Sequence, residues 1–514
     1  LNLVMRYIPE LAISPINKRD KNTDNPILIG SKGYFLKVLS SFDIPVPPGF
    51  IITTEVFRGY EAVIGYKYIF KDLSHRIYNE LLRLEKITGL KYGNPSNPLL
   101  LSVRSGATIS LPGMMSSFLN VGINEKIAEG LSKKPKFAWA AWDSYRRFIQ
   151  AWGMFQGLDR DLFDMVIGKF KDQYNISKKI QFTPDQMREI AIAYRDVLDK
   201  HGVFLPDDPN KQLEQAILQV FASWHSERAR LYRQQMGVSD DWGTAVIVQK
   251  MVFGNLDNSS GSGVIFTRDP KAMSSQVSLY GDFIFGVQGD DIVSGLVETY
   301  PITERQRIAE KRESPISLEK DFPEIYKELL AISEKLIYEK GFNHQEIEFT
   351  FENPTKNGLF ILQTRDMAQR TKKILNKFKP TEKLKASYLG SGIGVAGGAL
   401  SGRAVFHKKD IEKYRNEELE TPLILLRPDT VPDDVGILLK VDGLLTSRGG
   451  STSHAAVTVP QLNKVGVVGF TKLKVYEDEG YGIIEGVKIK SGDFISIDGY
   501  SGAVYLGAHD VVPE

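Results

Sequence analysis

One histidine of the sequence has neighbours that would leave its ring accessible. RGGSTSHAAV (448–457) places His454 after two glycines and among small hydroxylated residues, which are too small to shield an imidazole. The pattern predicts a tight turn that runs into a helix, with Ser451, Thr452 or Ser453 as the cap. Neutral imidazole is a competent nucleophile near pH 7, and a helix N-terminus favours a phosphoryl group. We therefore consider a phosphate-accepting histidine, with a packing histidine as the alternative; a metal ligand is disfavoured because no second His or Cys lies within ligand spacing.

A second group of polar residues falls on two predicted strands. In EIEFTFENPTKNGLFILQTRD (346–366) the turn NPTKNG separates two apolar runs, which predicts a hairpin. Alternate residues of a strand share a face, so Glu346 projects with Glu348, and Gln363 projects with Arg365. Carboxylate and amide oxygens suit Mg²⁺, and a guanidinium suits the phosphate oxygens that the metal bridges. Taken alone, the pattern favours a simpler interpretation, a solvated polar face at a sheet edge.

Glycine and serine are concentrated in NSSGSGVIFT (258–267), where a turn-rich loop is predicted to join two strands, AVIVQKMVFGN and GSGVIFTRDP. Glycines let a backbone approach a phosphate, and exposed N–H groups donate to its oxygens. The spacing matches neither the Walker A pattern nor the dinucleotide-binding fingerprint, so a simple turn is the alternative. Lys32 in IGSKGYF and Arg104 in SVRSGATIS are single cations among small residues; each suits phosphate, and each is equally compatible with an ordinary surface charge.

The composition limits the class of protein. The 514 residues suffice for about three domains, and the formal charge of +2 gives no electrostatic case for a nucleic-acid or membrane partner. No apolar run reaches the roughly 18 residues of a spanning helix. Cysteine is absent, which excludes disulfides, thiolate catalysis and cysteine-bound metal. The first residues lack the features of a signal peptide, so we expect a cytoplasmic protein.

Periodicity divides the chain into regions that would position these residues. Residues 26–125 mix short apolar runs with helical spacing, residues 126–240 are helical, and strand periodicity begins at Ala245. The basic segment 367–387 is predicted to be a linker, partly helical, and a compact β/α region follows it. We predict an α/β and α+β multidomain chain, with parts at 1–240, 241–367, 368–389 and 390–514.

Together these residues resemble the pyruvate phosphate dikinase family. The resemblance runs from about residue 26 to residue 508, and its motifs occur in the family's order. The motifs are GSKGYFLKVL, PVPPGFIITTE, SVRSGATISLPGMMSSFLNVGIN, WDSYRRFIQAWG, DDPNKQLEQAILQVFASWHSERARLYR, WGTAVIVQKMVFGN, SGSGVIFTRDP, EIEFTF, LFILQTRD and LTSRGGSTSHAAV. PGMM and the order of SW, RA and YR are more similar to the phosphate-using dikinase than to the water-using phosphoenolpyruvate synthase.

The resemblance implies an ATP-grasp domain with a helical insertion, followed by a small β/α swivelling phosphohistidine domain. It implies that the β-phosphoryl of ATP passes to a histidine, that AMP leaves, and that inorganic phosphate becomes pyrophosphate. His454 falls on the phosphate carrier, Arg365 and Arg104 on catalytic arginines, and Glu348 and Gln363 on the Mg²⁺-binding pair, with Glu346 beside them. The residues that fall on nucleotide contacts are Lys32, Arg104, Gln249, Met251, Val252, Ser260, Gly261, Ser262, Gly263, Glu348 and Gln363. Among them, the strand from Gln249 to Val252 falls on the adenine contact, and Ser260 to Gly263 fall on the phosphate loop.

The sequence also departs from the family. Glu346 stands where the family usually has Asp, Ser451 replaces a usual Met, and the linker is shorter than expected. No stretch resembles the family's phosphoenolpyruvate/pyruvate barrel, so we expect that barrel to be missing from this chain or supplied separately. The expected ligands are ATP and inorganic phosphate, and the final acceptor stays open. It is pyruvate through such a barrel, or another small molecule or protein; a catalytically silent nucleotide-sensing module is a further alternative, against which the intact set of site residues argues.

Overall fold

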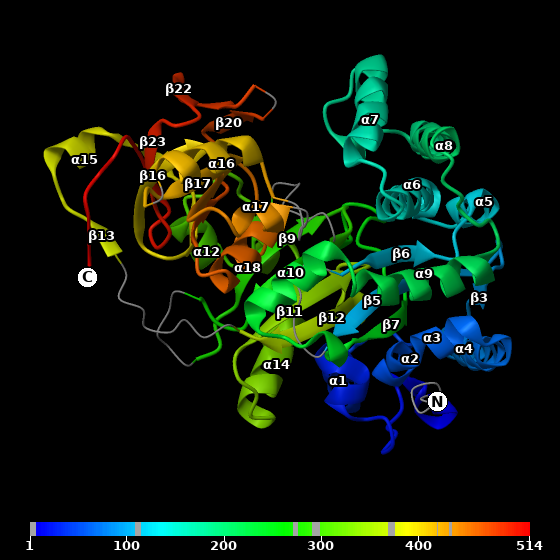
Figure 1. Cartoon of the computed structure of the whole chain (residues 1–514). Helices are drawn as coiled ribbons and strands as arrows, with labels where there is room; N and C mark the ends of the chain where they lie inside the picture. Colours follow the sequence, from blue (N-terminus) through cyan, green and yellow to red (C-terminus); the bar gives the residue numbers. More distant parts are fainter. Residues whose placement is uncertain are drawn as a thin grey trace. The chain divides into compact units, whose positions relative to one another are not determined.

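The structure, a computed structural model, describes residues 7–107, 115–270, 276–289, 299–367, 376–418, 420–430, 434–477 and 479–513. Internal contacts divide the chain of Figure 1 into two units. Unit 1 comprises Leu1–Gly261 and Phe349–Arg365, and unit 2 comprises Ser262–Glu348 and Asp366–Glu514. Each unit contains both helices and strands, which confirms the predicted mixed α/β, multidomain class. The four predicted domain ranges remain predictions.

Unit 1 is built on a five-stranded antiparallel sheet. Its order is β1-β2-β7-β5-β6, and every neighbouring pair is antiparallel. The strands are β1 (Ile13–Pro15), β2 (Gly49–Ile52), β5 (Leu101–Ala107), β6 (Ser117–Val121) and β7 (Thr244–Lys250). Strands β2 and β7 are buried almost throughout, because both are rich in β-branched and aromatic residues. Helices α1 (Pro26–Ser41), α2 (Thr54–Arg58) and α9 (Pro209–Ser223) pack against the sheet.

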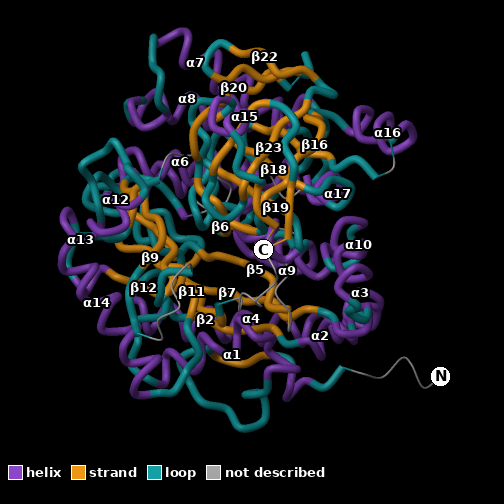
Figure 2. The backbone as a smooth tube through the Cα atoms, turned by 90° about the vertical axis from the view of Figure 1, so that its left-hand side faces the viewer, coloured by secondary structure: helices purple, strands orange, loops and turns teal. Residues whose placement is uncertain are grey.

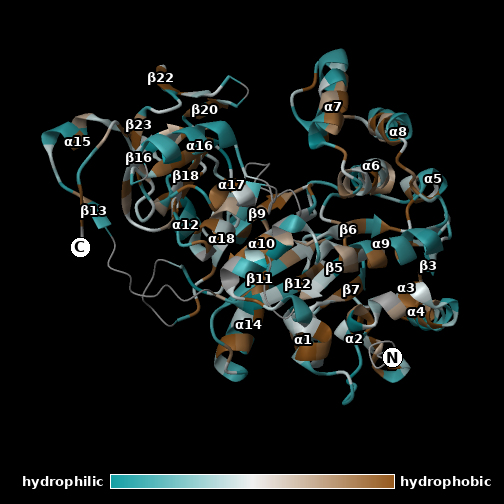
Figure 3. Cartoon of the chain, in the orientation of Figure 1, coloured by the Kyte–Doolittle hydropathy of each residue, from teal (hydrophilic) through white to brown (hydrophobic). Residues whose placement is uncertain are grey.

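The helical region predicted between residues 126 and 240 is confirmed. It contains α5 (Glu125–Ser132), α6 (Phe137–Phe155), α7 (Arg160–Tyr174), α8 (Pro184–Lys200), α9 and α10 (Glu227–Met236). Thr183 and Gln186 form a capping box that begins α8. Trp152 of α6 is fully buried, and its ring centroid lies 5.7 Å from that of Phe118 on β6, so the helices share a core with the sheet. Helix α7 carries both polar and apolar residues along its surface in Figure 3, as expected of a helix that buries one side.

The remaining elements of unit 1 are short, except α4. They are η1 (Pro9–Leu11), α3 (Tyr60–Gly65), α4 (Lys67–Thr88), β3 (Lys91–Tyr92), β4 (Pro98–Leu99), η2 (Lys179–Gln181), η3 (Asp240–Trp242) and η5 (Lys356–Gly358). No helix in the described ranges combines the length and the apolar character needed to cross a membrane.

A second five-stranded sheet has the order β10-β9-β8-β11-β12. Its strands are β8 (Gly261–Phe266), β9 (Tyr280–Phe285), β10 (Tyr300–Pro301), β11 (Gln345–Phe351) and β12 (Leu359–Asp366). Strands β11 and β12 are neighbours, as the hairpin prediction requires. Strands β7 and β8 both form, but they belong to different sheets, because residues 251–260 make a long connection instead of a tight hairpin turn. The helices that follow β10 are α12 (Glu304–Ala309), α13 (Leu318–Asp321), α14 (Pro323–Glu334) and the π-helix η4 (Lys335–Glu339).

Residues 388–506 of unit 2 form a mixed eight-stranded sheet, much of which Figure 2 shows as adjacent orange strands. Its order is β14-β24-β23-β16-β17-β18-β19-β15, with parallel pairing only from β16 to β19. The strands are β14 (Tyr388–Ser391), β15 (Ile393–Ala396), β16 (Ala399–Val405), β17 (Leu423–Arg427), β18 (Gly443–Thr446), β19 (Val465–Val468), β23 (Phe494–Asp498) and β24 (Ala503–Leu506). The helices are α16 (Lys408–Glu417), α17 (Val435–Leu438) and α18 (His454–Gln461), and β20 (Leu473–Tyr476), β21 (Tyr481–Ile484) and β22 (Val487–Lys490) make a small meander.

The predicted linker is described only in part. Residues 368–375 lie outside the described residues, and β13 (Asn376–Phe378) and α15 (Glu382–Ala386) follow, so the segment is partly helical as predicted. Strand β13 pairs with β25 (Val511–Pro513) in antiparallel orientation. The chain segments that enter and leave the eight-stranded sheet are therefore hydrogen-bonded to each other.

Candidate functional site

His454 is the first residue of α18, at the end of the glycine-containing turn. The Ser453 hydroxyl accepts a hydrogen bond from the backbone N–H of Ala456 (3.4 Å), which confirms the predicted turn into a helix and selects Ser453 as the cap. Thr458 lies one turn later, with its hydroxyl oxygen 3.2 Å from Nε2 of His454. His454 is only 2% exposed, contrary to the expectation of an accessible ring. Helix α18 packs against β15 and β19, and the small residues before it allow such close packing.

The turn before His454 is hydrogen-bonded to strand β9. The Ser451 hydroxyl donates to Oδ2 of Asp282 (2.6 Å), whose side chain is fully buried. The backbone of Gly450 comes so close to the same carboxylate that a Cβ there would lie 2.6 Å from Oδ2 of Asp282 and 2.8 Å from the Thr299 hydroxyl oxygen. The close approach therefore requires glycine at position 450.

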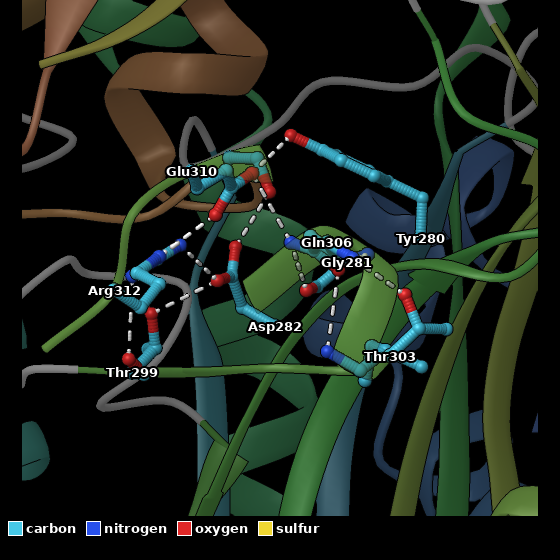
Figure 4. Close-up of polar contacts among 10 residues, drawn as sticks. Tyr280, Gly281, Asp282, Thr299, Thr303, Gln306, Glu310 and Arg312 are labelled. Atoms are coloured by element: carbon cyan, nitrogen blue, oxygen red, sulfur yellow. Dashed lines mark hydrogen bonds and ion pairs between the residues drawn. The ribbon is translucent and has the colours of Figure 1, made fainter. Parts of the chain in front are cut away.

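Asp282 belongs to a buried polar network, shown in Figure 4. Its Oδ1 accepts hydrogen bonds from Arg312 (3.0 Å) and from the Thr299 hydroxyl (3.1 Å). Arg312 also donates to Glu310 (2.7 Å), which accepts a second hydrogen bond from the Tyr280 hydroxyl (2.6 Å). Burial alone would lower the pKa of Arg312, but the charges of Asp282 and Glu310 raise it above its ordinary value. Burial and Glu310 raise the pKa of Tyr280, so the phenol stays a neutral donor.

Replacement of Asp282 by Ala is expected to destabilise unit 2 by roughly 1–3 kcal/mol, because it removes the buried acceptor of the Thr299 and Ser451 hydroxyls and one of the two carboxylates that pair with Arg312. Urea unfolding would measure the loss. Glu382→Ala is the matched control, because Glu382 pairs with Lys385 at an exposed position and its loss should cost about 0–1 kcal/mol. Equal losses in the two variants would contradict a stabilising role for the Asp282 network.

In unit 1, helix α1 and strand β5 bring two of the predicted cations onto adjacent elements. Ser31 donates from its hydroxyl to the carbonyl of Ala107 (3.3 Å), so the start of α1 lies against the end of β5. Lys32 follows Ser31 on α1, Arg104 lies on β5, and both side chains are partly exposed. The structure thus places the two predicted cations on elements that contact each other, α1 and β5.

The segment predicted to contact adenine leaves the sheet at the end of β7. Gln249 is buried, and its side-chain amide donates to the carbonyl of Pro47 (2.9 Å), so it fixes the turn before β2. Met251 and Val252 are also buried. The next residue, Phe253, donates its backbone N–H to Glu352 (3.1 Å). This stretch is therefore held on both sides by described residues of unit 1.

The glycine–serine loop is organised by its own serine. The hydroxyl oxygen of Ser260 accepts hydrogen bonds from the backbone N–H groups of Leu256 (3.0 Å) and Asp257 (3.1 Å), and it lies 3.0 Å from the carbonyl of Gly254. Ser260 is fully buried, so its side chain shapes the loop from within. Gly261, Ser262 and Gly263 begin the buried strand β8.

The two glutamates and the Gln–Arg pair lie on β11 and β12. Glu346 and Glu348 are partly exposed and alternate with buried residues, which confirms that they share a face of β11. On β12, Gln363 is buried and Arg365 is partly exposed. Burial raises the pKa of Tyr232, and the nearby charge of Arg365 opposes that rise. Within the described residues, no group of three or more His, Asp or Glu side chains could hold a metal ion, so a cation at the glutamates would need other oxygen ligands as well.

Two family models match the chain. The one described as "Pyruvate phosphate dikinase, AMP/ATP-binding domain" matches residues 64–312, and the one described as "PEP-utilising enzyme, mobile domain" matches residues 419–502. Pyruvate, phosphate dikinase of Rickettsia typhi is 36% identical over 526 residues, which cover 96% of this chain and 57% of the relative. The chain is pyruvate phosphate dikinase-like. Similar matches are the dikinase of Clostridium symbiosum (34% identical, 93% of this chain and 56% of the relative) and the chloroplastic dikinase of Flaveria trinervia (34%, 96% and 53%).

The matched ranges of this dikinase-like chain contain most of the predicted site. His454 and Ser451 fall in the mobile-domain match, and Arg104, Gln249 and the glycine–serine loop fall in the AMP/ATP-binding match. Lys32, Glu346, Glu348, Gln363 and Arg365 lie outside both matched ranges. The chain spans a little over half the length of the curated relatives it matches, 57% for the Rickettsia typhi dikinase.

Some residues of this dikinase-like site were not found from the sequence. Asp282 and Arg312 form the network under the histidine turn, and Asp143 of α6 binds Asn255 at the start of the glycine–serine loop. One feature of the sequence indicates that Asp143 is paired. Arginines follow it at positions i+3 and i+4, and side chains with this spacing are neighbours on a helix. No comparable local signal marks Asp282.

Proposed function

We propose that the chain performs the nucleotide half of a dikinase reaction. The β-phosphoryl of ATP is transferred to His454 and AMP leaves, while the γ-phosphoryl passes to inorganic phosphate and gives pyrophosphate. The observation that carries the proposal is the position of His454, at the capped N-terminus of α18 within the part that matches a mobile domain of phosphoenolpyruvate-utilising enzymes. The names of the relatives and the AMP/ATP-binding match support the nucleotide as the phosphoryl donor.

The charged residues of unit 1 would bind the triphosphate. Lys32 and Arg104 supply positive charge at α1 and β5, and Arg365 supplies it on β12. Phosphoryl transfer depends mainly on positioning and on neutralisation of charge on the phosphate oxygens, and these cations provide both. The buried stretch of Met251 and Val252 would contact the base, and backbone N–H groups near Ser260 would face the phosphates.

Magnesium fits the donor set on β11 and β12. Carboxylates and amides are ligands that Mg²⁺ prefers, and the remaining positions would be taken by phosphate oxygens and water. Glu348 and Gln363 would hold the ion, with Glu346 beside them. When bound, the ion would offset negative charge on the triphosphate. Glu346 is one methylene longer than the usual Asp and would place its carboxylate further from the strand.

The acceptor of the phosphohistidine is the second part of the proposal. By analogy with the named relatives, pyruvate would receive the phosphoryl group at a barrel on a longer form of the protein or on a separate chain. Strands β13 and β25 pair with each other and both contact β16 of the eight-stranded sheet, so a movement of this sheet would carry them with it. Transfer to another small molecule or to a protein is the competing possibility, which a chase experiment separates.

The test uses the purified chain, Mg²⁺ and ATP labelled at either the β- or the γ-phosphoryl, with and without inorganic phosphate. We expect acid-labile label on His454 from the β position only, formation of AMP, and dependence on phosphate. Label from the γ position with release of ADP instead of AMP would show an ordinary kinase and overturn the proposal. Label from the β position but not the γ position, formed with AMP in the absence of inorganic phosphate, would assign the synthase type of reaction instead.

A further inference from the structure

Helix α6 holds the segment that runs from the adenine stretch to the glycine–serine loop. At the start of the helix, the ring of Phe137 packs edge-on against Phe253, with centroids 5.1 Å apart. The ammonium group of Lys136 lies 2.9 Å from the carboxylate of Asp257 and 3.3 Å from the hydroxyl of Ser259. The contacts of Lys136 are partly exposed, so each contributes little to stability. They show which side of the loop faces α6.

The strongest contact of α6 with this segment is buried. Asp143 is fully buried and accepts hydrogen bonds from Arg146 (2.7 Å) and from Arg147 (2.7 Å). Its Oδ2 also accepts a hydrogen bond from the side-chain amide of Asn255 (3.1 Å). Although burial would raise the pKa of Asp143, the charges of Arg147 and Arg146 lower it well below its usual range. Asp143 is therefore an ionised acceptor that three donors surround.

An ionised carboxylate dictates how the Asn255 amide is oriented. Only the NH₂ group of the amide can donate to Asp143, so the amide oxygen Oδ1 must point away from it. Asn255 is 1% exposed, and among the described residues Oδ1 has no hydrogen-bond partner. A buried acceptor without a donor is unfavourable in free energy, because it has lost its hydrogen bonds to water. The arrangement thus keeps one acceptor unsatisfied beside the loop, and a ligand that brings a donor would recover this free energy.

The position of Asn255 in the sequence indicates which group of a ligand would donate to Oδ1. Residues 249–252 are predicted to contact the base and residues 260–263 the phosphates, so Asn255 lies on the stretch between them. In a nucleotide the ribose lies between base and phosphates, and its 2′- and 3′-hydroxyls are hydrogen-bond donors. We propose that Oδ1 of Asn255 accepts a hydrogen bond from a ribose hydroxyl of the bound nucleotide, and that Asp143 is the positioning residue that orients it.

This inference rests on the proposed function, because it requires a nucleotide in unit 1. It goes further by assigning a residue that distinguishes ribonucleotides from deoxynucleotides. A hydrogen bond worth about 0.5–1.5 kcal/mol corresponds to a roughly two- to tenfold preference for ATP over the analogue that lacks the hydroxyl.

The test compares the binding of ATP, 2′-deoxy-ATP and 3′-deoxy-ATP to the full chain by isothermal titration calorimetry. We expect the wild type to bind one deoxy analogue roughly two- to tenfold more weakly than ATP. Asn255→Ala should weaken ATP to the level of that analogue and remove the preference. Asp143→Asn should also remove the preference, because an amide at 143 no longer fixes the orientation of Asn255.

Gln212→Ala is the matched control. Gln212 is an equally buried amide, but it donates to the carbonyls of Ile123 and Pro206 and accepts from Gly122, so its hydrogen bonds are all internal. This variant should lower the unfolding temperature and keep the preference for ATP. If the preference for ATP survives in Asn255→Ala, the role of Asn255 is overturned. Equal affinity of the wild type for all three nucleotides would do the same, and both results leave the proposed function intact. Failure of the wild type to bind any nucleotide would overturn the proposed function as well.

Discussion

His454→Asn is expected to reduce acid-labile labelling from ATP to background and to leave nucleotide affinity unchanged. Asn preserves a polar side chain of similar width at the start of α18 but has no ring nitrogen that can attack phosphorus. The predicted nucleotide contacts of unit 1 are untouched by the substitution. Trapping of the label followed by peptide mapping would measure the first effect, and calorimetric titration with ATP the second. Undiminished label in this variant would remove His454 as the phosphate carrier.

Thr458→Val provides a graded comparison for that experiment. The Thr458 hydroxyl lies 3.2 Å from Nε2 of His454, and the valine retains the shape of the side chain without the hydrogen bond. We expect labelling to slow by roughly two- to tenfold, the effect of a single hydrogen bond of about 0.5–1.5 kcal/mol. A variant that labels at the wild-type rate would show that the ring is oriented by packing alone.

Local patterns in the sequence predicted local structure well. The two glycines and the hydroxyl-bearing residues before His454 identified a turn and a capped helix, because capping depends on residues within one turn of each other. The alternation around Glu346 and Glu348 identified a shared strand face for the same reason. The helical region between residues 126 and 240 followed from its repeated apolar spacing. In each case the decisive interaction spans only a few residues.

The contacts that complete the site could not be predicted in this way. Ser451 and Asp282 are 169 residues apart in sequence, and Asn255 and Asp143 are 112 residues apart. Nothing in one polar residue specifies its partner across such a distance, because the pairing depends on how sheets and helices pack. The separation of β7 and β8 into different sheets is a similar case, since the turn-rich residues between them suit a hairpin and a longer connection equally.

The burial of His454 shows how a correct local prediction can still mislead about accessibility. Small residues around a side chain permit access to solvent, and they also permit another element to pack closely. At Gly450 the small residue permits close packing, because the backbone lies against the carboxylate of Asp282 and the hydroxyl of Thr299. Small residues at this turn therefore serve close contact, and the Ser451 hydroxyl adds a charge-assisted hydrogen bond to it.

Gly30→Ala is expected to be strongly destabilising, because among the described glycines of unit 1 an added Cβ would come closest to another atom at Gly30. Gly30 interrupts α1 with φ of 70° and ψ of 163°, a conformation that essentially only glycine adopts. A Cβ at this position would lie 1.6 Å from the carbonyl oxygen of Gly106 and 3.2 Å from that of Ala107. Both atoms belong to the backbone of β5, and at Gly106 and Ala107 this strand is paired with β7, which limits how far it can move aside.

The clash would push the start of α1 away from β5, the strand that carries Arg104. Strain of about 1–3 kcal/mol and overpacking of about 1–3 kcal/mol predict a loss of roughly 2–6 kcal/mol in the free energy of unfolding. Because Lys32 is two residues from Gly30, a displaced α1 should also weaken ATP binding. Gly168→Ala in α7 is the control, since its Cβ would meet no atom within 4 Å and should stabilise the helix by about 0.4–1 kcal/mol. Urea unfolding and ATP titration measure both variants. If Gly30→Ala unfolds and binds ATP as the wild type does, α1 does not position Lys32 through this contact.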